Sequence, residues 1–345
     1  MRRFTPIQGS IVAGCVWMLA ALIGPQTAHA GAWQATVGAQ SADLGRQALA
    51  FLPNELWIHV GDTITWTHDA DDAHTVTFLT AGQLRPLDPT IPPSAGSSFD
   101  GMTFVNSGLL LGVGETYTVT FPTAGNFKLV CLVHANMTAA IHVLAPSAAL
   151  PHDQTFYDDR ANHERVALLL DSNWNAEVEP TDSGRTVRVG DGKIVATGGG
   201  SQARSVVRFH PGATVVHAGD TVEWTNSDPG NLHTVTFGPD PVAAPFPIGV
   251  NAALDADGAL HAIVDLLPPT ATVHSGILQA LPQDRGVVAI LQPQTLTDLV
   301  QYPLPETKFD VNQRFRVTFT HPGVFQFHCV FHDNLGMEGQ VIVTP

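Results

Sequence analysis

Hydrophobic and polar residues alternate in short runs along most of the chain, as in "TITW" (63–66), "YTVTF" (117–121) and "AAIHVL" (139–144). Alternation with a period of two turns one face of each run toward a core and the other toward solvent, which predicts β-strands. Gly, Pro, Asp and Asn separate the runs and predict turns. Short strands at this spacing predict an all-β fold of Greek-key β-sandwiches.

One stretch breaks this alternation. Residues 152–170, "HDQTFYDDRANHERVALLL", place Phe156, Val166, Leu169 and Leu170 at spacings that fit one face of a helix. Such spacing, with no strand-like alternation, predicts a helix in this part of the chain.

The chain also contains an internal repeat. Three segments of the first half return in the same order in the second half: 59–78 as 217–237, 105–110 as 273–278, and 117–137 as 315–337. Repetition in one order indicates that each half is one folding unit of the same kind.

We therefore predict one domain over 31–146 and a second over 186–345, joined by a partly helical linker over 147–185. The second copy is longer than the first. Most of its additional residues fall at about 279–312, which predicts a loop inserted between two matched strands.

The first thirty residues have the pattern of an export signal. Arg2 and Arg3 precede an apolar stretch at 11–23, and "AHA" (28–30) offers small residues for cleavage after Ala30. This pattern predicts a signal peptide over 1–30 and a periplasmic or secreted protein. "VAGC" (12–15) is the alternative, a lipoprotein cleavage box. No later stretch has the length and apolarity of a transmembrane helix, so none is predicted in the mature chain.

The charge of the chain limits its partners. The formal net charge is -15, and removal of 1–30 takes away Arg2 and Arg3 and no acid, which gives -15 - 2 = -17. Binding to nucleic acid needs clustered Lys and Arg, so nucleic acid is not expected as a partner. An acidic protein is attracted to basic partners over long range, which favours a basic redox protein.

Removal of the predicted signal leaves two cysteines, Cys131 and Cys329. Two cysteines in an exported protein usually form a disulfide. These two, however, occupy the same place in the two copies of the repeat, so we expect each to do the same work in its own domain. A single buried cysteine is usually a small hydrophobic residue. Two in register, each with the same neighbours, favour a functional interpretation.

Each cysteine is accompanied by two histidines and a methionine. The two sets are His74, Cys131, His134 and Met137, and His233, Cys329, His332 and Met337. Two imidazoles, a thiolate and a weak thioether suit copper that cycles between two oxidation states. The sequence therefore predicts one copper in each domain, two per chain.

Both halves resemble cupredoxins of the plastocyanin type, the small blue-copper electron carriers. The resemblance lies in "GDTITWTHDADDAHTVTF" (61–78) and "GDTVEWTNSDPGNLHTVTF" (219–237), which resemble the segment with that family's first histidine ligand. "CLVHANM" (131–137) resembles the short ligand loop of amicyanin, and "CVFHDNLGM" (329–337) the longer loop of plastocyanin.

The resemblance implies the cupredoxin fold, the eight ligands given above as two type 1 sites, and electron transfer without an enzymatic reaction. It also implies that His134 and His332 bring a ring edge to the surface, where electrons enter and leave. The cupredoxin resemblance does not identify the partner.

Two other functions remain open at this point. One is a two-domain multicopper oxidase or a copper nitrite reductase, which needs a further copper centre built from additional histidines. No H-x-H pair occurs in the chain, but His328 directly precedes Cys329, as a histidine that bridges two centres would. The other is a copper-binding or copper-delivery protein without a redox role, which favours exposed, exchangeable donors.

Overall fold

A computed structural model describes residues 30–86, 88–134, 136–170, 184–241, 251–257, 259–264, 272–278, 280 and 314–345. Within these residues the chain is mostly β-sheet, with one α-helix. The predicted signal peptide at 1–30 lies outside the described residues except for Ala30. The predicted insertion at 279–312 lies outside them except for Ala280.

Within the described residues the first half contains nine strands, and the alternating runs quoted above fall on three of them. The nine strands are β1 (Ala32–Gln40), β2 (Arg46–Leu52), β3 (Glu55–His59), β4 (Thr63–His68), β5 (Thr77–Phe78), β6 (Val105–Asn106), β7 (Thr116–Thr120), β8 (Gly125–Val130) and β9 (Thr138–Leu144).

The residues of the second half that the structure describes repeat this order and contain two more strands. Its strands are β10 (Thr186–Thr197), β11 (Gly200–His210), β12 (Ala213–His217), β13 (Thr221–Asn226), β14 (Thr236–Phe237), β15 (Ala253–Leu254), β16 (Leu260–Val264), β17 (Val273–His274), β18 (Arg314–Phe319), β19 (Gly323–His328) and β20 (Glu338–Thr344). The additional pair, β15 and β16, extends the sheet beside β18.

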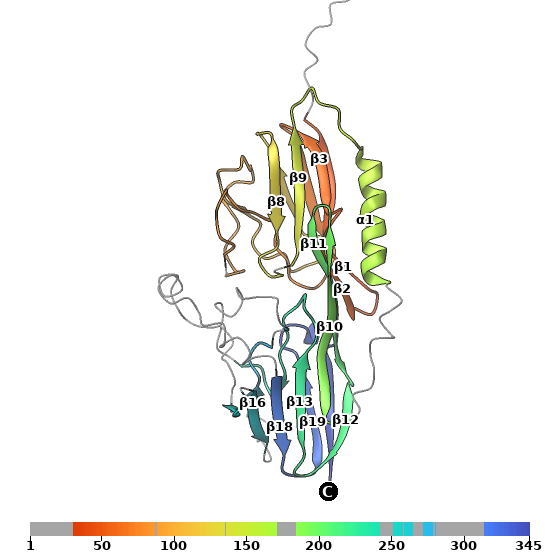
Figure 1. Cartoon of the computed structure of the whole chain (residues 1–345), viewed down its shortest axis with the longest axis vertical. Coiled ribbons are helices and arrows are strands. Elements are labelled where there is room, and N and C mark those ends of the chain that lie inside the picture. Colours follow the sequence, from red (N-terminus) through yellow and green to blue (C-terminus); the bar gives the residue numbers. More distant parts are fainter. Residues whose placement is uncertain are drawn as a thin grey trace, which may run out of the picture.

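The strands form three sheets, which make two sandwiches arranged end to end (Figure 1). A ten-stranded sheet with the order β15-β16-β18-β13-β10-β11-β2-β1-β4-β7 supplies one layer of both sandwiches. The second layer is β3-β9-β8-β5-β6 in the first half and β12-β20-β19-β14-β17 in the second. In both halves the first strand pairs in parallel with the fourth, as β1 with β4 and β10 with β13. The predicted pair of Greek-key β-sandwiches is confirmed.

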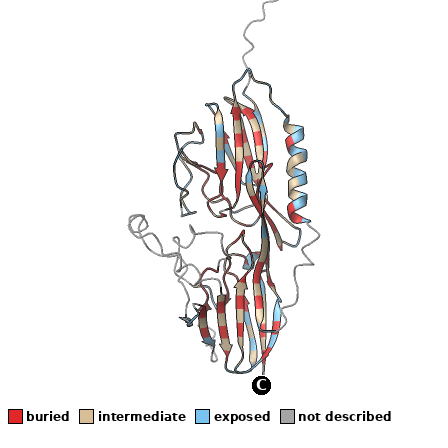
Figure 2. Cartoon of the chain, viewed as in Figure 1, coloured by how far each residue is buried: buried red, intermediate tan, exposed pale blue. Residues whose placement is uncertain are grey.

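Both cores are built around the same residues of the repeat. Trp66 of β4 and Trp224 of β13 are fully buried, and each lies against the phenylalanine of its "HTVTF" segment, Phe78 and Phe237. The inward residues of the alternating strands form the core of each sandwich. Figure 2 shows that buried and more exposed positions alternate along many of the strands. The alternation seen in the sequence is therefore the alternation between core and solvent.

The two halves also pair with each other. Strand β11 is antiparallel to β2, with Ala203 opposite Leu49 and Val206 opposite Arg46. Ala203 belongs to the hydrophobic core of the first sandwich, although it follows the predicted domain limit at 186. The β10–β11 hairpin therefore reaches from the second half onto the first (Figure 1). The limits 31–146 and 186–345 remain a sequence prediction.

The predicted helix is present as α1 (Gln154–Leu169), which begins after Asp153, whose side chain accepts a hydrogen bond from the Phe156 N–H. The apolar face predicted for it is partly wrong. Leu169 is buried, but Phe156 and Val166 are 40% and 43% exposed, and Tyr157 is buried in their place. The Trp57 N–H donates to the Tyr157 hydroxyl at 2.9 Å, which ties the helix to the first sandwich. In the described parts of the chain, no helix combines the length and apolarity needed to cross a membrane.

Candidate metal centres

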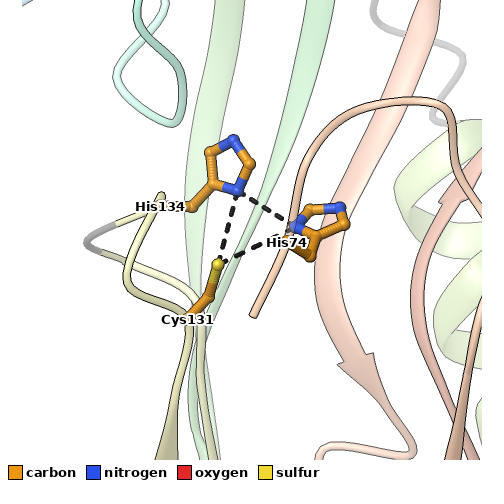
Figure 3. A group of neighbouring side chains, drawn as sticks. All are labelled: His74, Cys131 and His134. Carbon is orange, nitrogen blue, oxygen red and sulfur yellow. Dashed lines mark hydrogen bonds between the residues drawn. The ribbon is translucent and has the colours of Figure 1, made fainter. Parts of the chain in front are cut away.

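Three of the predicted donors of the first set lie together in the core at one end of the first sandwich. Cys131 Sγ is 3.9 Å from His74 Nδ1 and 3.8 Å from His134 Nδ1, and the two Nδ1 atoms are 3.1 Å apart. Figure 3 shows the three side chains pointing toward one another, Cys131 and His134 from one loop and His74 from another segment of the chain. All three are at most 1% exposed.

The second set has the same arrangement. Cys329 Sγ is 4.0 Å from His233 Nδ1 and 3.4 Å from His332 Nδ1. These three side chains are again at most 1% exposed. Each half of the repeat therefore brings one thiol and two imidazoles to the same place, with Nδ1 facing the sulfur in every case.

Strand geometry explains why the cysteines point inward. Cys131 directly follows β8, and Leu129, two positions earlier, is fully buried on the same face. Cys329 follows β19 in the same way, two positions after the buried Phe327. Because side chains alternate along a strand, the period of two carries each thiol into the core.

Each methionine closes the loop that begins at its cysteine. The Cys131 N–H donates to the Met137 carbonyl at 3.0 Å, and the Met137 N–H donates to the His134 carbonyl at 3.1 Å. The same two bonds join Cys329, His332 and Met337 in the second site. Both methionine side chains are fully buried. The loop thus holds His and Met beside the cysteine.

A threonine after each first histidine fixes the sulfur. The Thr75 N–H donates to Cys131 Sγ at 3.4 Å, and the Thr234 N–H donates to Cys329 Sγ at 3.3 Å. The hydroxyl of Thr75 accepts from the Leu132 N–H at 2.8 Å. A hydrogen bond to sulfur tunes a metal thiolate, so these threonines belong to the layer that surrounds the donors.

Two glycines allow the first histidine of each site to approach the backbone. Gly38 and Gly190 have φ of 70° and 68° and lie where the register of β1 and β10 shifts. A Cβ at Gly38 would lie 2.6 Å from His74 Nε2, and one at Gly190 would lie 2.4 Å from His233 Nε2. Any other residue would therefore collide with the imidazole and adopt an unfavourable φ.

The histidines beside each cysteine favour its thiolate form. Burial alone would raise the pKa of the Cys131 thiol, but the neighbouring His134 and His74 outweigh it and hold that pKa well below its usual value. The same balance, with His332 and His233 as the neighbours, lowers the pKa of Cys329. Thiolate is the form of cysteine that binds metals.

The outer nitrogens of three of the four site histidines, His134, His233 and His332, face aspartates. Asp228 Oδ2 lies 3.2 Å from His233 Nε2, and both side chains are fully buried. Asp72 Oδ2 lies 3.5 Å from His134 Nε2. Burial would raise the pKa of Asp72, but attraction to His134 and His332 outweighs it and holds that pKa well below its usual value. Carboxylates that face the outer nitrogen of a ligand histidine orient its ring.

The expected surface position of the loop histidines is wrong. His134 and His332 are each 1% exposed, because both lie where the two sandwiches meet. The cupredoxin resemblance does not predict this burial, because it concerns each half of the chain separately.

Both cysteines are free, as expected from their equivalent positions in the repeat. In each site a thiol of lowered pKa and two Nδ1 atoms lie within 4.8 Å of one another in a buried pocket of side chains. This soft donor set with a buried methionine beside it is consistent with type 1 copper. Fold and sites together define a protein with two cupredoxin domains.

Comparison with known proteins agrees with this class. The family model for copper binding proteins of the plastocyanin/azurin family matches residues 38–144. Plastocyanin of Scenedesmus fuscus is 32% identical over 104 residues, which are 30% of this chain and 92% of the relative. The chain belongs to the plastocyanin/azurin family.

Other matches are more limited. Chloroplastic plastocyanin of Tetradesmus obliquus is 34% identical over 93 residues. These residues are 27% of this chain, and the chain spans about half, 54%, of that relative. A solved structure of a reduced amicyanin mutant is 22% identical and covers 33% of this chain and 83% of the amicyanin, with a TM-score of 0.23. The family model covers the first half only, and the second half repeats the strand order of the first with β15 and β16 added.

Asp72, Asp228, Gly38 and Gly190 were not predicted from the sequence. The glycines could have been found, because "VG" at 37–38 and at 189–190 extends the repeat upstream of the segments compared. The aspartates could not, because they stand in loops that differ in length by one residue between the two copies.

Proposed function

We propose that this chain is an exported electron-transfer protein with two type 1 copper sites, one in each sandwich. The observation that carries the proposal is the recurrence of the same buried Cys and two His in register within the repeat. The residues that would hold copper are His74, Cys131, His134 and Met137 in the first site, and His233, Cys329, His332 and Met337 in the second.

Bound copper would supply a one-electron couple. The chain's own residues position the donors: the loop bonds and the N–H donors from Thr75 and Thr234 fix each sulfur. Burial excludes water from the donors. A rigid, dry donor set changes little when an electron arrives, which suits a carrier.

Copper analysis together with spectroscopy tests the proposal. We expect two coppers per chain, an intense visible thiolate-to-copper band, and electron paramagnetic resonance signals with narrow hyperfine splitting that account for both ions. A protein that binds copper without such a band, or that retains a single copper when fully loaded, would contradict it.

A copper oxidoreductase is the second candidate, favoured by one observation. His328 Nε2 lies 2.6 Å from Asp240 Oδ1, and with Asp333 these side chains form a third group whose possible ligand atoms are within 4.8 Å of one another. A second type of copper bound there would give a stoichiometric signal with wide splitting. Copper delivery is less favoured, because a delivery site needs exchangeable donors and both His–Cys–His groups are buried.

We further propose export through a signal peptide cleaved after Ala30, and a basic redox protein as the partner. The acidic balance of the chain supports the second proposal. The N-terminal residue of the protein recovered from the periplasm or the medium tests the first. If partner association is steered by charge, electron exchange with a basic cytochrome slows as salt increases, because ions screen the attraction. A rate that does not change with ionic strength would contradict a charge-steered partner.

A further inference from the structure

One carboxylate lies between the loop histidines of the two sites. Asp72 is 6% exposed and stands where the two sandwiches meet. Its Oδ2 is 3.5 Å from His134 Nε2, and its Oδ1 is 3.8 Å from His332 Nε2. His134 belongs to the first site and His332 to the second. A single side chain therefore contacts both sites.

Both halves of the chain hold Asp72 in this position. Asn231 of the second half donates from Nδ2 to Asp72 Oδ2 at 2.9 Å. From the first half, His68 Nε2 lies 3.0 Å from the Asp72 carbonyl oxygen. An isolated buried carboxylate is costly, and paired groups with additional hydrogen bonds offset that cost. The contacts of Asp72 with two imidazoles and an amide supply this pairing.

The orientation of His134 and His332 places Asp72 between the two sites, so that it connects them. In each ring Nδ1 faces the cysteine sulfur, so Nε2 points away from the donors and toward Asp72. One continuous sequence of side chains from one thiol to the other is thus imidazole, carboxylate, imidazole. Every member is buried, so no bulk water has to reorganise around this route.

We propose that His134, Asp72 and His332 carry an electron between the two sites, so that the chain works as one two-electron unit with internal exchange. This rests on the proposed function. In the step, one site loses an electron and the other gains it. No bond forms or breaks, and no further reactant takes part.

The same geometry gives Asp72 a second effect. A negative charge near a metal stabilises its more positive, oxidised state and so lowers its reduction potential. Because Asp72 stands at similar distances from His134 and His332, it lowers the potentials of both sites together. Asp228 contacts His233 alone and acts on the second site only.

Two substitutions separate the charge of Asp72 from its role as a route. Asp72→Asn removes the charge and keeps the side chain, and we expect it to raise both potentials, each by a change of about tenfold in the one-electron equilibrium, or 59 mV. Asp72→Ala also removes the connecting atoms, and we expect internal exchange to slow by roughly tenfold or more, as for a residue that carries coupling between sites. Potentials come from spectroelectrochemistry of the copper-loaded protein, and internal exchange from pulse radiolysis.

The controls lie on the same loop and in the second half. Asp71→Asn removes an exposed charge that accepts from Gln40 at 2.9 Å, and we expect it to change neither potential nor the exchange rate. Asp228→Asn should raise the potential of the second site alone. Cys131→Ser and Cys329→Ser assign each potential to its site. A shift confined to one site in Asp72→Asn, or an exchange rate unchanged in Asp72→Ala, would overturn the proposal.

The unmodified protein provides a test that does not depend on the folding of a variant. After partial reduction, we expect electrons to redistribute between the sites at a rate independent of protein concentration. A mixture of the Cys131→Ser and Cys329→Ser proteins should redistribute them only in proportion to concentration. Concentration dependence in the unmodified protein would refute internal exchange. Absence of two blue coppers would instead refute the proposed function, so the two failures are distinguishable.

Discussion

The two candidate copper sites share one backbone arrangement and differ in what surrounds the first histidine. His74 Nε2 has no hydrogen-bond partner among the described residues, whereas His233 Nε2 faces Asp228. Burial therefore lowers the pKa of His74. Burial also acts on His233, but its hydrogen bonds to Asp228 and Cys329 outweigh it and raise that pKa. The repeat thus preserves the donors, while one loop residue changes the charge around them.

The loops from Cys131 to Met137 and from Cys329 to Met337 differ in length, but the same backbone hydrogen bonds close both of them. In the second site a short 3₁₀ turn, Asp333–Leu335, with Gly336 at φ 84°, takes up the additional residues between histidine and methionine. The Met337 N–H still donates to the His332 carbonyl at 3.0 Å, as the Met137 N–H does to His134. Extra loop residues are absorbed away from the donors, so length alone does not make the sites different.

Replacing one of the two cysteines should have the largest effect, because it removes the thiolate from one site and leaves the other site intact. We expect Cys131→Ser to lose the copper of the first site and keep the second, and Cys329→Ser to do the reverse, because every donor of a site lies within one half. Copper analysis and the visible spectrum measure this. Loss of both coppers from either folded variant would show that the sites do not bind independently.

A smaller disturbance comes from the glycines behind the first histidines. Gly38→Ala and Gly190→Ala should each weaken copper binding at the adjacent site by about 10- to 100-fold, as changes to the layer around metal ligands do. The reason is the close approach of a Cβ to His74 or His233. Copper titration followed by the visible band measures the effect.

Gly61→Ala and Gly219→Ala are matched controls, since both glycines have φ of 93° and a Cβ there would meet nothing within 4 Å. They share the backbone strain, about 1–2 kcal/mol, without the collision. Equal loss of copper affinity in all four variants would show that strain, and not contact with the imidazole, is responsible.

Acid should separate the two sites. Copper binds the neutral form of histidine, so a proton competes with copper at a higher pH where the pKa of the histidine is raised. Since the pKa of His233 is raised and that of His74 is lowered, the second site should release copper at a higher pH than the first as the solution is acidified.

Titration of Cys131→Ser and Cys329→Ser proteins with acid measures each release separately. In Asp228→Asn, which weakens the hydrogen bond that raises the pKa of His233, release from the second site should move to lower pH. Earlier release from the first site would contradict this interpretation of the two environments.

The smallest effect is expected at His328, which has no counterpart in the first half, where Val130 takes its place. His328 points away from the adjacent thiol and pairs with Asp240, so His328→Ala should leave both narrow-splitting signals and both potentials nearly unchanged. A wide-splitting copper signal that disappears in this variant, together with loss of oxygen or nitrite turnover, would favour the enzyme.

The alternating runs and the internal repeat predicted much of the fold and of the two donor groups. The alternating runs located the strands, and the repeat placed His74 with Cys131 and His233 with Cys329, because local periodicity and equivalent position are properties of the chain itself. Helix α1 was also predicted, but its buried face was not, since Tyr157 is chosen by contact with Trp57 on another element.

What could not be predicted depends on how the halves meet. The pairing of β11 with β2, the burial of His134 and His332, and the position of Asp72 all arise from packing between units that were compared as separate copies. A repeat shows what two units share. It says nothing about the surface through which they contact each other.

Strand β2 has a consequence for any attempt to divide the chain. Five of its seven residues are apolar, all but Arg46 are buried, and the edge that does not pair with β1 is covered by β11 from the second half. A fragment that ends near residue 146 would leave β2 as an open sheet edge. Uncovered apolar edges recruit strands from other molecules and lead to aggregation. The second half thus protects the solubility of the first.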